Sequence, residues 1–187
     1  VCGDMLHDDG YTTWYGDTLP ERPPHRYRFV HFRPLGGLVS MEAESLVLPP
    51  ADPDYEVRKI EADDLFSLPP DEPVHWCQRH SFLRNAAPFL EFSGAFAGGT
   101  LQAYMAVGIA SPKAALLDIR CRDGRVAAGN ELLRRLVQRH RAPFTAQFLP
   151  TPSYAHSLLT TAGFAVTRES FQIRRDLLAP RSTRTEP

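Results

Sequence analysis

The segment from Leu116 to Leu177 constrains the fold more than any other, because strand-like and helix-like patterns follow one another along it without a break. Apolar and polar residues alternate over 116–121, as in a half-buried strand. Leucines then recur at helical spacing over 132–137, and Pro143 stops that helix. Alternation returns over 144–149. Two strands joined by one helical crossover are expected to run parallel.

A second helix is expected after the second strand. The run Thr151–Ser153 offers a capping residue and a proline suited to a first helical turn. Tyr154, Leu158 and Ala162 then share one helical face, and Gly163 ends the helix. The chain is expected to be extended again after this glycine.

The clearest hairpin lies upstream, where Leu90–Ala97 and Thr100–Ile109 are joined by Gly98-Gly99. This dipeptide supplies the two residues with positive φ that a tight turn needs. The pattern over 55–60 predicts a short strand, and the acidic run 61–65 predicts the start of a helix. Further elements are expected over the ranges 25–32 and 37–48, as extended segments, and 74–84, as a helix.

A proline-rich run at 49–53 looks like a linker and is the best domain boundary in the chain. It separates an N-terminal extension, 1–48, from a domain over 54–178. The polar tail at 179–187 is expected to be disordered.

Composition excludes several classes of function. A net charge of −1 gives no general attraction to nucleic acid or to an anionic membrane. No apolar run approaches the ~20 residues that span a bilayer, and no signal-peptide pattern opens the chain, so we expect a cytoplasmic location. The three cysteines are far apart and the histidines are scattered, so we expect neither a disulfide framework nor a metal site.

The turn at 122–130 is the first candidate for chemistry. Glycines between a strand and a helix let backbone N–H groups approach a phosphate, which the helix N-terminus also favours. Strand-to-helix turns also contain glycine for plain geometric reasons. Taken alone, the turn leaves both interpretations open.

Several ionisable side chains are candidate acids and bases. Tyr154 has a phenol able to act as a general acid, although its helical partners favour a packed role. Glu91, Asp118 and Glu131 are each able to serve as a base, directly or through water. All three are equally well explained as solvated surface carboxylates.

The order of elements from Tyr55 to Leu177 resembles the GNAT superfamily of acyl-CoA N-acyltransferases, over about two-thirds of the chain. The resemblance implies an α/β fold of the α+β type with a mixed central sheet. In that sheet, antiparallel N-terminal strands lead to a parallel pair that splays apart, and helices flank the sheet.

The turn at 122–130 contains the sequence motif on which the resemblance rests. In the family, Gln or Arg, two residues, Gly, one residue, and Gly or Ala precede a Leu-Leu pair and grip the CoA pyrophosphate through backbone amides. The run 129–133, Gly-Asn-Glu-Leu-Leu, matches the end of this pattern, while Gly124 replaces the Gln or Arg and Ala127 replaces the first glycine. The strand before the turn would pair with the pantetheine arm. The implied acyl-CoA-binding residues are Ile119, Arg120, Cys121, Gly124, Arg125, Ala127, Gly129 and Asn130.

The implied reaction is direct attack of a primary amine on acetyl-CoA or another acyl-CoA, with no metal, and the acceptor is a small molecule or a peptide. Leu159 stands where the family often has a Tyr, so the acid must come from elsewhere, with Tyr154 or Ser153 the nearest substitutes. Tyr154 and Glu91 are the expected catalytic residues. The alternative is a catalytically inactive GNAT-like domain that binds a ligand or a partner. A small doubly wound nucleotide-binding domain is disfavoured by the Gly98-Gly99 hairpin.

Two further segments are similar to parts of tandem members of the superfamily. They are Asp9-Gly10-Tyr11 and the tryptophan-containing run 74–79. The resemblance implies that this chain is the C-terminal unit of a tandem protein and that 1–48 is the remnant of a preceding GNAT-like unit. A second such unit, or a second copy of the chain, is then an expected packing partner.

Overall fold

The computed structural model describes residues 13–18, 33–68, 75, 78–109, 114–122 and 125–176, with side chains from 36 to 172 within these ranges. The chain forms two compact units, one of Val1–Gly36 with Ser170–Pro187 and one of Gly37–Glu169. In the smaller unit, β1 (Thr13–Thr18) pairs antiparallel with the second half of β8 (Ala165–Asp176), from Thr13 opposite Asp176 to Thr18 opposite Phe171.

The larger unit is built on a mixed sheet. Its strand order is β8–β2–β7–β6–β5–β4–β3, to which β2 and β8 contribute their residues 37–43 and 165–169. The pairs β2–β7, β3–β4, β4–β5 and β5–β6 are antiparallel, whereas β6 and β7 are parallel, as the helical crossover predicts. The strands are β2 (Arg33–Ala43), β3 (Glu56–Lys59), β4 (Leu90–Ala97), β5 (Thr100–Gly108), β6 (Ala114–Cys121) and β7 (Phe144–Thr151).

The hairpin of β4 and β5 confirms the prediction from the Gly-Gly pair. Gly98 and Gly99 have φ values of 55° and 76°, and Ala97 lies opposite Thr100 across the turn. Residues with a Cβ rarely adopt two such values in succession. The turn therefore depends on both glycines.

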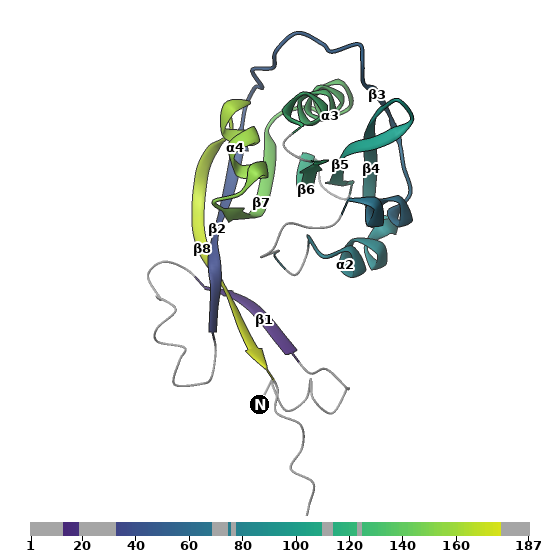
Figure 1. The fold of residues 1–187 in the computed structure, drawn as a ribbon. Coiled ribbons are helices and arrows are strands. Elements are labelled where there is room, and N and C mark those ends of the chain that lie inside the picture. The colour runs from purple at the N-terminus through teal and green to yellow at the C-terminus, as the bar shows by residue number, and fades with distance from the viewer. Residues whose placement is uncertain are drawn as a thin grey trace, which may run out of the picture. The chain divides into compact units, whose positions relative to one another are not determined.

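Helices cover both faces of this sheet (Figure 1). α3 (Val126–Arg139) and α4 (Tyr154–Thr161) pack on one face, and η2 (Ala62–Ser67), α2 (His80–Asn85) and the short η4 (Ala87–Phe89) pack on the other. Within the part of the chain that the structure describes, no helix is long and apolar enough to cross a membrane.

β5 divides the hydrophobic core into two clusters. Ala103, Met105 and Val107 belong to the cluster under α3 and α4, while Tyr104 and Ala106 belong to the cluster under η2 and α2. Side chains of successive strand residues point to opposite faces, so one apolar strand supplies both cores.

Two helix predictions differ from the structure in length. The helix expected over 74–84 begins only at His80, after an N-cap residue, Arg79, with extended backbone, and Gln78 contacts β6 through both its side chain and its carbonyl. The helix expected from Glu61 is a 3₁₀ segment, closed by a capping box between Glu61 and Asp64. The strand expected over 25–32 and the tail 179–187 lie outside the described residues.

The larger unit extends beyond the segment that the sequence assigns to the domain. The boundary predicted from the sequence lies at 49–53, whereas residues 37–43 of β2 form part of the sheet. In the order of strands, β2 lies between β7 and β8. The Thr167 side chain of β8 donates a hydrogen bond to the Ser40 carbonyl of β2 at 3.2 Å.

α3 comes closest to α4 and β6 at Gly129. A Cβ atom at this position would lie 2.6 Å from Leu158 Cδ2 and 2.9 Å from Cys121 Sγ, well inside van der Waals contact. The Gly129 N–H is directed along the helix to the Arg125 carbonyl, at 3.4 Å. Gly129 is thus buried between α3, α4 and β6, and its missing side chain sets the spacing of these three elements.

Replacing Gly129 by Ala is expected to lower the free energy of unfolding by about 1–3 kcal/mol, because the added methyl overpacks this interface. A loss of stability would be informative, because helix propensity alone favours alanine over glycine by roughly 1 kcal/mol. Urea denaturation measures the difference. Val126→Ala, at an exposed position of the same helix, is the control and should change stability by less than about 0.5 kcal/mol. A Gly129→Ala protein as stable as the wild type would contradict the close approach.

Candidate functional site

The two parallel strands separate after a short common stretch. β6 and β7 pair only from Ala114 opposite Phe144 to Leu116 opposite Ala146, although both strands continue. From 117 to 121, the edge of β6 that leaves β7 has no paired residue in that strand. Backbone groups at such an edge are available to an extended ligand.

Two β-bulges explain the separation. Leu117 is an extra residue in β6, since Leu116 and Asp118 lie opposite consecutive residues of β5. In β7, residues 147 and 148 together oppose the single residue Ser40 of β2. Phe148 accordingly has a φ of 58°, which is rare outside glycine. Because a bulge bends its strand, two bulges directly after the last common pair turn the strands apart.

The N-terminus of α3 follows the free part of β6. Its N-cap residue, Arg125, makes no side-chain cap, and the first turn contains no acidic residue. The first N–H groups of a helix have no partner within the helix, and they carry a partial positive charge. The Arg122 guanidinium donates hydrogen bonds to the carbonyls of Leu101 and Ser67, at 3.3 and 3.1 Å. This helix end can accept an anion.

Cys121 and Tyr154 meet on the α3 side of the separated strands. Burial raises the pKa of the Cys121 thiol to about 12, against the smaller opposing effects of Tyr154 and the Gly129 backbone. Burial and the neighbouring Cys121 also raise the pKa of Tyr154 above its ordinary value. The Tyr154 hydroxyl oxygen is buried without a hydrogen-bond partner of good geometry. Both groups therefore keep their protons at neutral pH.

Residues before α2 contact the separated strands from the opposite face. The ring of His75, which is fully buried, stacks on Phe148 of β7 with centroids 4.5 Å apart and planes 11° from parallel. The Gln78 side-chain amide donates to the Leu117 carbonyl in the bulge of β6, at 3.0 Å. One short stretch of chain thereby contacts both strands next to their bulges.

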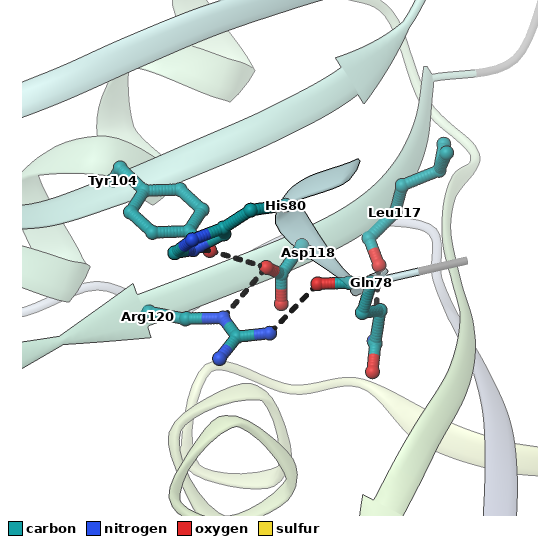
Figure 2. A network of polar contacts seen from close by, with 6 residues as sticks. All are labelled: Gln78, His80, Tyr104, Leu117, Asp118 and Arg120. Atoms are coloured by element: carbon teal, nitrogen blue, oxygen red, sulfur yellow. Dashed lines mark hydrogen bonds and ion pairs between the residues drawn. The ribbon is translucent and has the colours of Figure 1, made fainter. Parts of the chain in front are cut away.

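A buried polar network continues from Gln78 along β6 (Figure 2). Asp118 Oδ2 accepts hydrogen bonds from the Tyr104 hydroxyl and from Arg120 Nε, both at 2.7 Å. Arg120 Nη2 donates to the Gln78 carbonyl at 2.9 Å. His80 Nε2 lies 3.5 Å from the Tyr104 hydroxyl. Burial and then Arg120 lower the pKa of His80, and burial and Asp118 raise that of Tyr104.

The structure brings some of the predicted site residues together and leaves others apart. Cys121 and Tyr154 meet, Arg125 is exposed at the N-cap, and Ala127 and Asn130 are half-buried in the first turns of α3. Ile119 is buried in the core beneath that helix. Gly124 lies outside the described residues.

The two expected bases outside β6 are engaged elsewhere. Glu91 forms an ion pair with Arg139 at the C-terminal end of α3. Glu131 accepts a hydrogen bond from the backbone N–H of Asp52 at 3.0 Å and pairs with Arg134 at 3.2 Å, so it connects the linker to α3. Asp118, the third candidate, is the centre of the polar network.

Sequence reasoning did not identify Tyr104, His80 and Gln78 as members of this site. A signal was present in β6, where Asp118 and Arg120 are the polar residues of the alternating pattern over 116–121. Their meeting with α2 depends on tertiary packing. Among the described residues, no three His, Cys, Asp or Glu side chains gather as they would around a metal ion.

Comparison with known proteins identifies the fold. No protein-family model and no curated protein sequence matches the chain. Solved structures do match. A GCN5-related N-acetyltransferase from Kribbella flavida has a TM-score of 0.60 at 11% identity, over 92% of this chain and 71% of that chain. A functionally unknown conserved protein from Staphylococcus epidermidis has a TM-score of 0.67 at 9% identity, over 94% of this chain and 77% of that one.

The chain therefore has the fold of the GCN5-related N-acetyltransferases, the GNAT fold, as the order of its elements predicts. A further match is the GCN5-related N-acetyltransferase from Sphaerobacter thermophilus, with a TM-score of 0.59, 14% identity and 88% of this chain covered. This chain spans 60% of that protein, and 56% of a matching Drosophila protein.

The neutral state of Cys121 can be measured directly. In a protein with Cys2 and Cys77 replaced by Ser, iodoacetamide at pH 8 should alkylate Cys121 at least about 100-fold more slowly than in the urea-unfolded chain. A pKa of about 12 leaves almost no thiolate at this pH. Mass spectrometry gives both rates. A native rate within tenfold of the unfolded rate would contradict the burial of this thiol.

Proposed function

We propose that the larger unit binds an acyl-CoA between the separated ends of β6 and β7 and transfers its acyl group to a primary amine. The observation that carries this proposal is the divergence of the two strands after Leu116 and Ala146, next to an uncapped helix N-terminus. An unpaired strand edge suits a ligand with amides along its length, and a helix N-terminus suits a phosphate. An acyl-CoA has both.

The residues proposed to hold the CoA act mainly through their backbone. Residues 125–128 would bind the pyrophosphate, and residues 119–121 would pair with the pantetheine arm. Arg125 is the exposed cation nearest to this helix end. Gly129 acts indirectly, because its lack of a side chain lets α3 approach α4 and β6.

The proposed chemistry is direct attack on a thioester, which the acyl-CoA supplies when bound. The amine nitrogen forms a bond to the acyl carbon, the carbon–sulfur bond breaks, and the amine loses a proton while the thiolate gains one. Tyr154 would donate the second proton, since its raised pKa keeps the phenol protonated and its hydroxyl is not engaged in a good hydrogen bond. Glu91 is not proposed as the base, because Arg139 binds it.

A second candidate is a GNAT-like module that binds a ligand or a partner without chemistry. The amide of Gln78 supports it, since this side chain already occupies the Leu117 carbonyl on the free part of β6. The buried stack of His75 on Phe148 supports it from the β7 side. The absence of a Tyr at Leu159 is consistent with the same interpretation.

The match to about half of longer proteins supports a further part of the proposal. The chain would be the C-terminal unit of a tandem protein, with a preceding GNAT-like unit or a second copy as its partner. The acceptor would be a small molecule or a peptide that carries a primary amine.

Introducing an acid at the start of α3 separates cofactor binding from stability. Val126→Glu is expected to weaken acetyl-CoA binding at least tenfold, about 1.4 kcal/mol, because the carboxylate repels the pyrophosphate. The same change should raise the free energy of unfolding by roughly 0.3–1 kcal/mol, because acids stabilise a helix N-terminus. Calorimetry and urea denaturation measure the two effects.

The matched control for this variant is Val137→Glu, which adds the same charge at an exposed position late in the helix and should leave affinity unchanged. Equal affinity of the Val126→Glu and wild-type proteins would reject the placement of the phosphates. No heat with acetyl-CoA or longer acyl-CoAs up to millimolar concentration in the wild type would reject acyl-CoA as the ligand.

Replacing Tyr154 by Phe tests the proposed acid. The turnover number for acyl transfer should fall by about 10²-fold or more, while the dissociation constant for acetyl-CoA stays within twofold. The melting temperature should not fall, because the change removes a buried hydroxyl that lacks a good partner. Full turnover in this variant would remove Tyr154 from the mechanism.

A further inference from the structure

The outer edge of β3 is an exposed strand edge in the larger unit. Among the strands that the structure describes, β3 stands last in the sheet and pairs with β4 alone. Glu56, Arg58 and Lys59 are exposed on it, and Val57 is half-buried. A strand at the end of a sheet presents main-chain N–H and C=O groups on its open side, so it can pair with a further strand.

The register of β3 on β4 shows which main-chain groups are on the open side. The Ile60 N–H donates to the Phe92 carbonyl at 3.2 Å, so these two residues form a hydrogen-bonded pair. Such pairs alternate with non-hydrogen-bonded pairs along an antiparallel ladder. Residues 58 and 56 therefore also direct their main-chain groups to β4. The N–H and C=O groups of Val57 and Lys59 point away from the sheet.

This edge carries one anion and one cation on the same face. Glu56 and Arg58 are two residues apart, so their side chains point to the same side of the sheet. Within the described part of the chain, neither forms an ion pair with the other or with another residue. The Arg58 guanidinium lies over the Phe96 ring, 4.1 Å from its centroid. A guanidinium stacked by its face keeps the N–H groups at its rim available to a carboxylate.

We propose that this edge is a homodimer interface, in which β3 of a second copy pairs antiparallel about a twofold axis at Val57. Glu56 then lies opposite Arg58 of the second copy, and Arg58 lies opposite Glu56 of that copy. The two Val57 residues exchange main-chain hydrogen bonds, and each Lys59 N–H donates to the Tyr55 carbonyl across the axis. The proposal commits to a second copy as the partner and does not depend on acyl-CoA binding.

Charge selects this register over its neighbours. An axis at Glu56 would place two carboxylates opposite each other, and an axis at Arg58 would place two guanidinium groups opposite each other. Opposed like charges destabilise a strand pair, whereas opposed unlike charges stabilise it. With the axis at Val57, Glu56 and Arg58 occupy non-hydrogen-bonded positions of the new ladder, where facing side chains are closest. Both symmetric contacts are then attractive.

The surroundings of β3 leave room for such a partner but limit the strength of the contact. On the charged face, Arg58 and Phe96 line a surface hollow of about 570 Å³, so this side of the edge is open. The strand is only four residues long. Interfaces that bury less than about 1,200 Å² are usually transient, so we expect a dissociation constant on the order of 1–100 µM.

Sedimentation velocity of the whole chain with reductant present should show a reversible dimer in this range. Glu56→Arg and Arg58→Glu should each weaken it about tenfold or more, because each variant places like charges opposite each other at both contacts. An equimolar mixture of the two variants should associate about as tightly as the wild type, because their charges are again complementary. A mixture no tighter than the separate variants would overturn the proposed register.

The control variant is Glu169→Arg, which makes the same charge change at an exposed position of β8, at the other end of the sheet in the larger unit. Its dissociation constant should stay within twofold of the wild-type value, and a loss equal to that of Glu56→Arg would overturn the proposal. Hydrogen exchange should slow at the Val57 and Lys59 amides when the dimer is populated. Unchanged exchange at both amides in a dimeric sample would place the interface elsewhere and overturn the proposal.

The outcomes separate this inference from the proposed acyl transfer. A wild type that remains monomeric up to about 300 µM, above the expected range of dissociation constants, overturns the β3 interface and leaves acyl-CoA binding untouched. A wild type that dimerises through β3 but gives no heat with any acyl-CoA supports the interface and rejects the acyltransferase.

Discussion

The divergence of β6 and β7 is the constraint on which the rest of the larger unit depends. It follows from two bulges at one level, Leu117 in β6 and the pair 147–148 in β7. Beyond the bulges, β6 stays paired with β5 and β7 stays paired with β2, but β6 and β7 no longer pair with each other. The free edge, the start of α3 and the contacts of His75 and Gln78 all lie along this separation. A single bulge would bend one strand; two bulges turn the pair apart without breaking the sheet on either side.

The two faces of the separated strands are built for different tasks. Beneath α3 and α4 the packing is close and apolar, so Cys121 and Tyr154 remain uncharged. Beneath α2, Asp118 and Arg120 form a buried ion pair, and Asp118 accepts the hydrogen bond of the Tyr104 hydroxyl. Burial and then Arg120 lower the pKa of the neighbouring His80. Burying a charged pair is costly, and the hydrogen bonds from Tyr104 and to Gln78 offset this cost.

The sequence predicted what depends on local pattern. Alternation in 116–121 and 144–149 with the helical spacing of the leucines predicted the parallel pair, and the Gly98-Gly99 turn predicted the hairpin. It did not predict what depends on contacts distant in sequence. Tyr104, His80 and Asp118 come from three elements, and their spacing in the sequence does not predict that they come together. The assignment of Gly129 to a phosphate turn stays a prediction, whereas its close packing against Leu158 and Cys121 is a long-range contact that motif spacing does not reveal. The extension of the sheet by β2 was missed for a similar reason: a strand before a proline-rich linker looks independent until its partner β7 is known.

The departures of the turn from the family pattern bear less on ligand binding than the contacts at Leu117 do. Helix N–H groups and strand edges bind through the main chain, so Gly124 and Ala127 in place of other residues leave those groups present. Gln78 is different, because its amide already satisfies the Leu117 carbonyl. An arriving amide that uses this carbonyl must share it with Gln78 or displace Gln78, whose own carbonyl binds Arg120 and, through it, Asp118 and Tyr104. Occupation of the strand edge is therefore coupled physically to the network that orients His80.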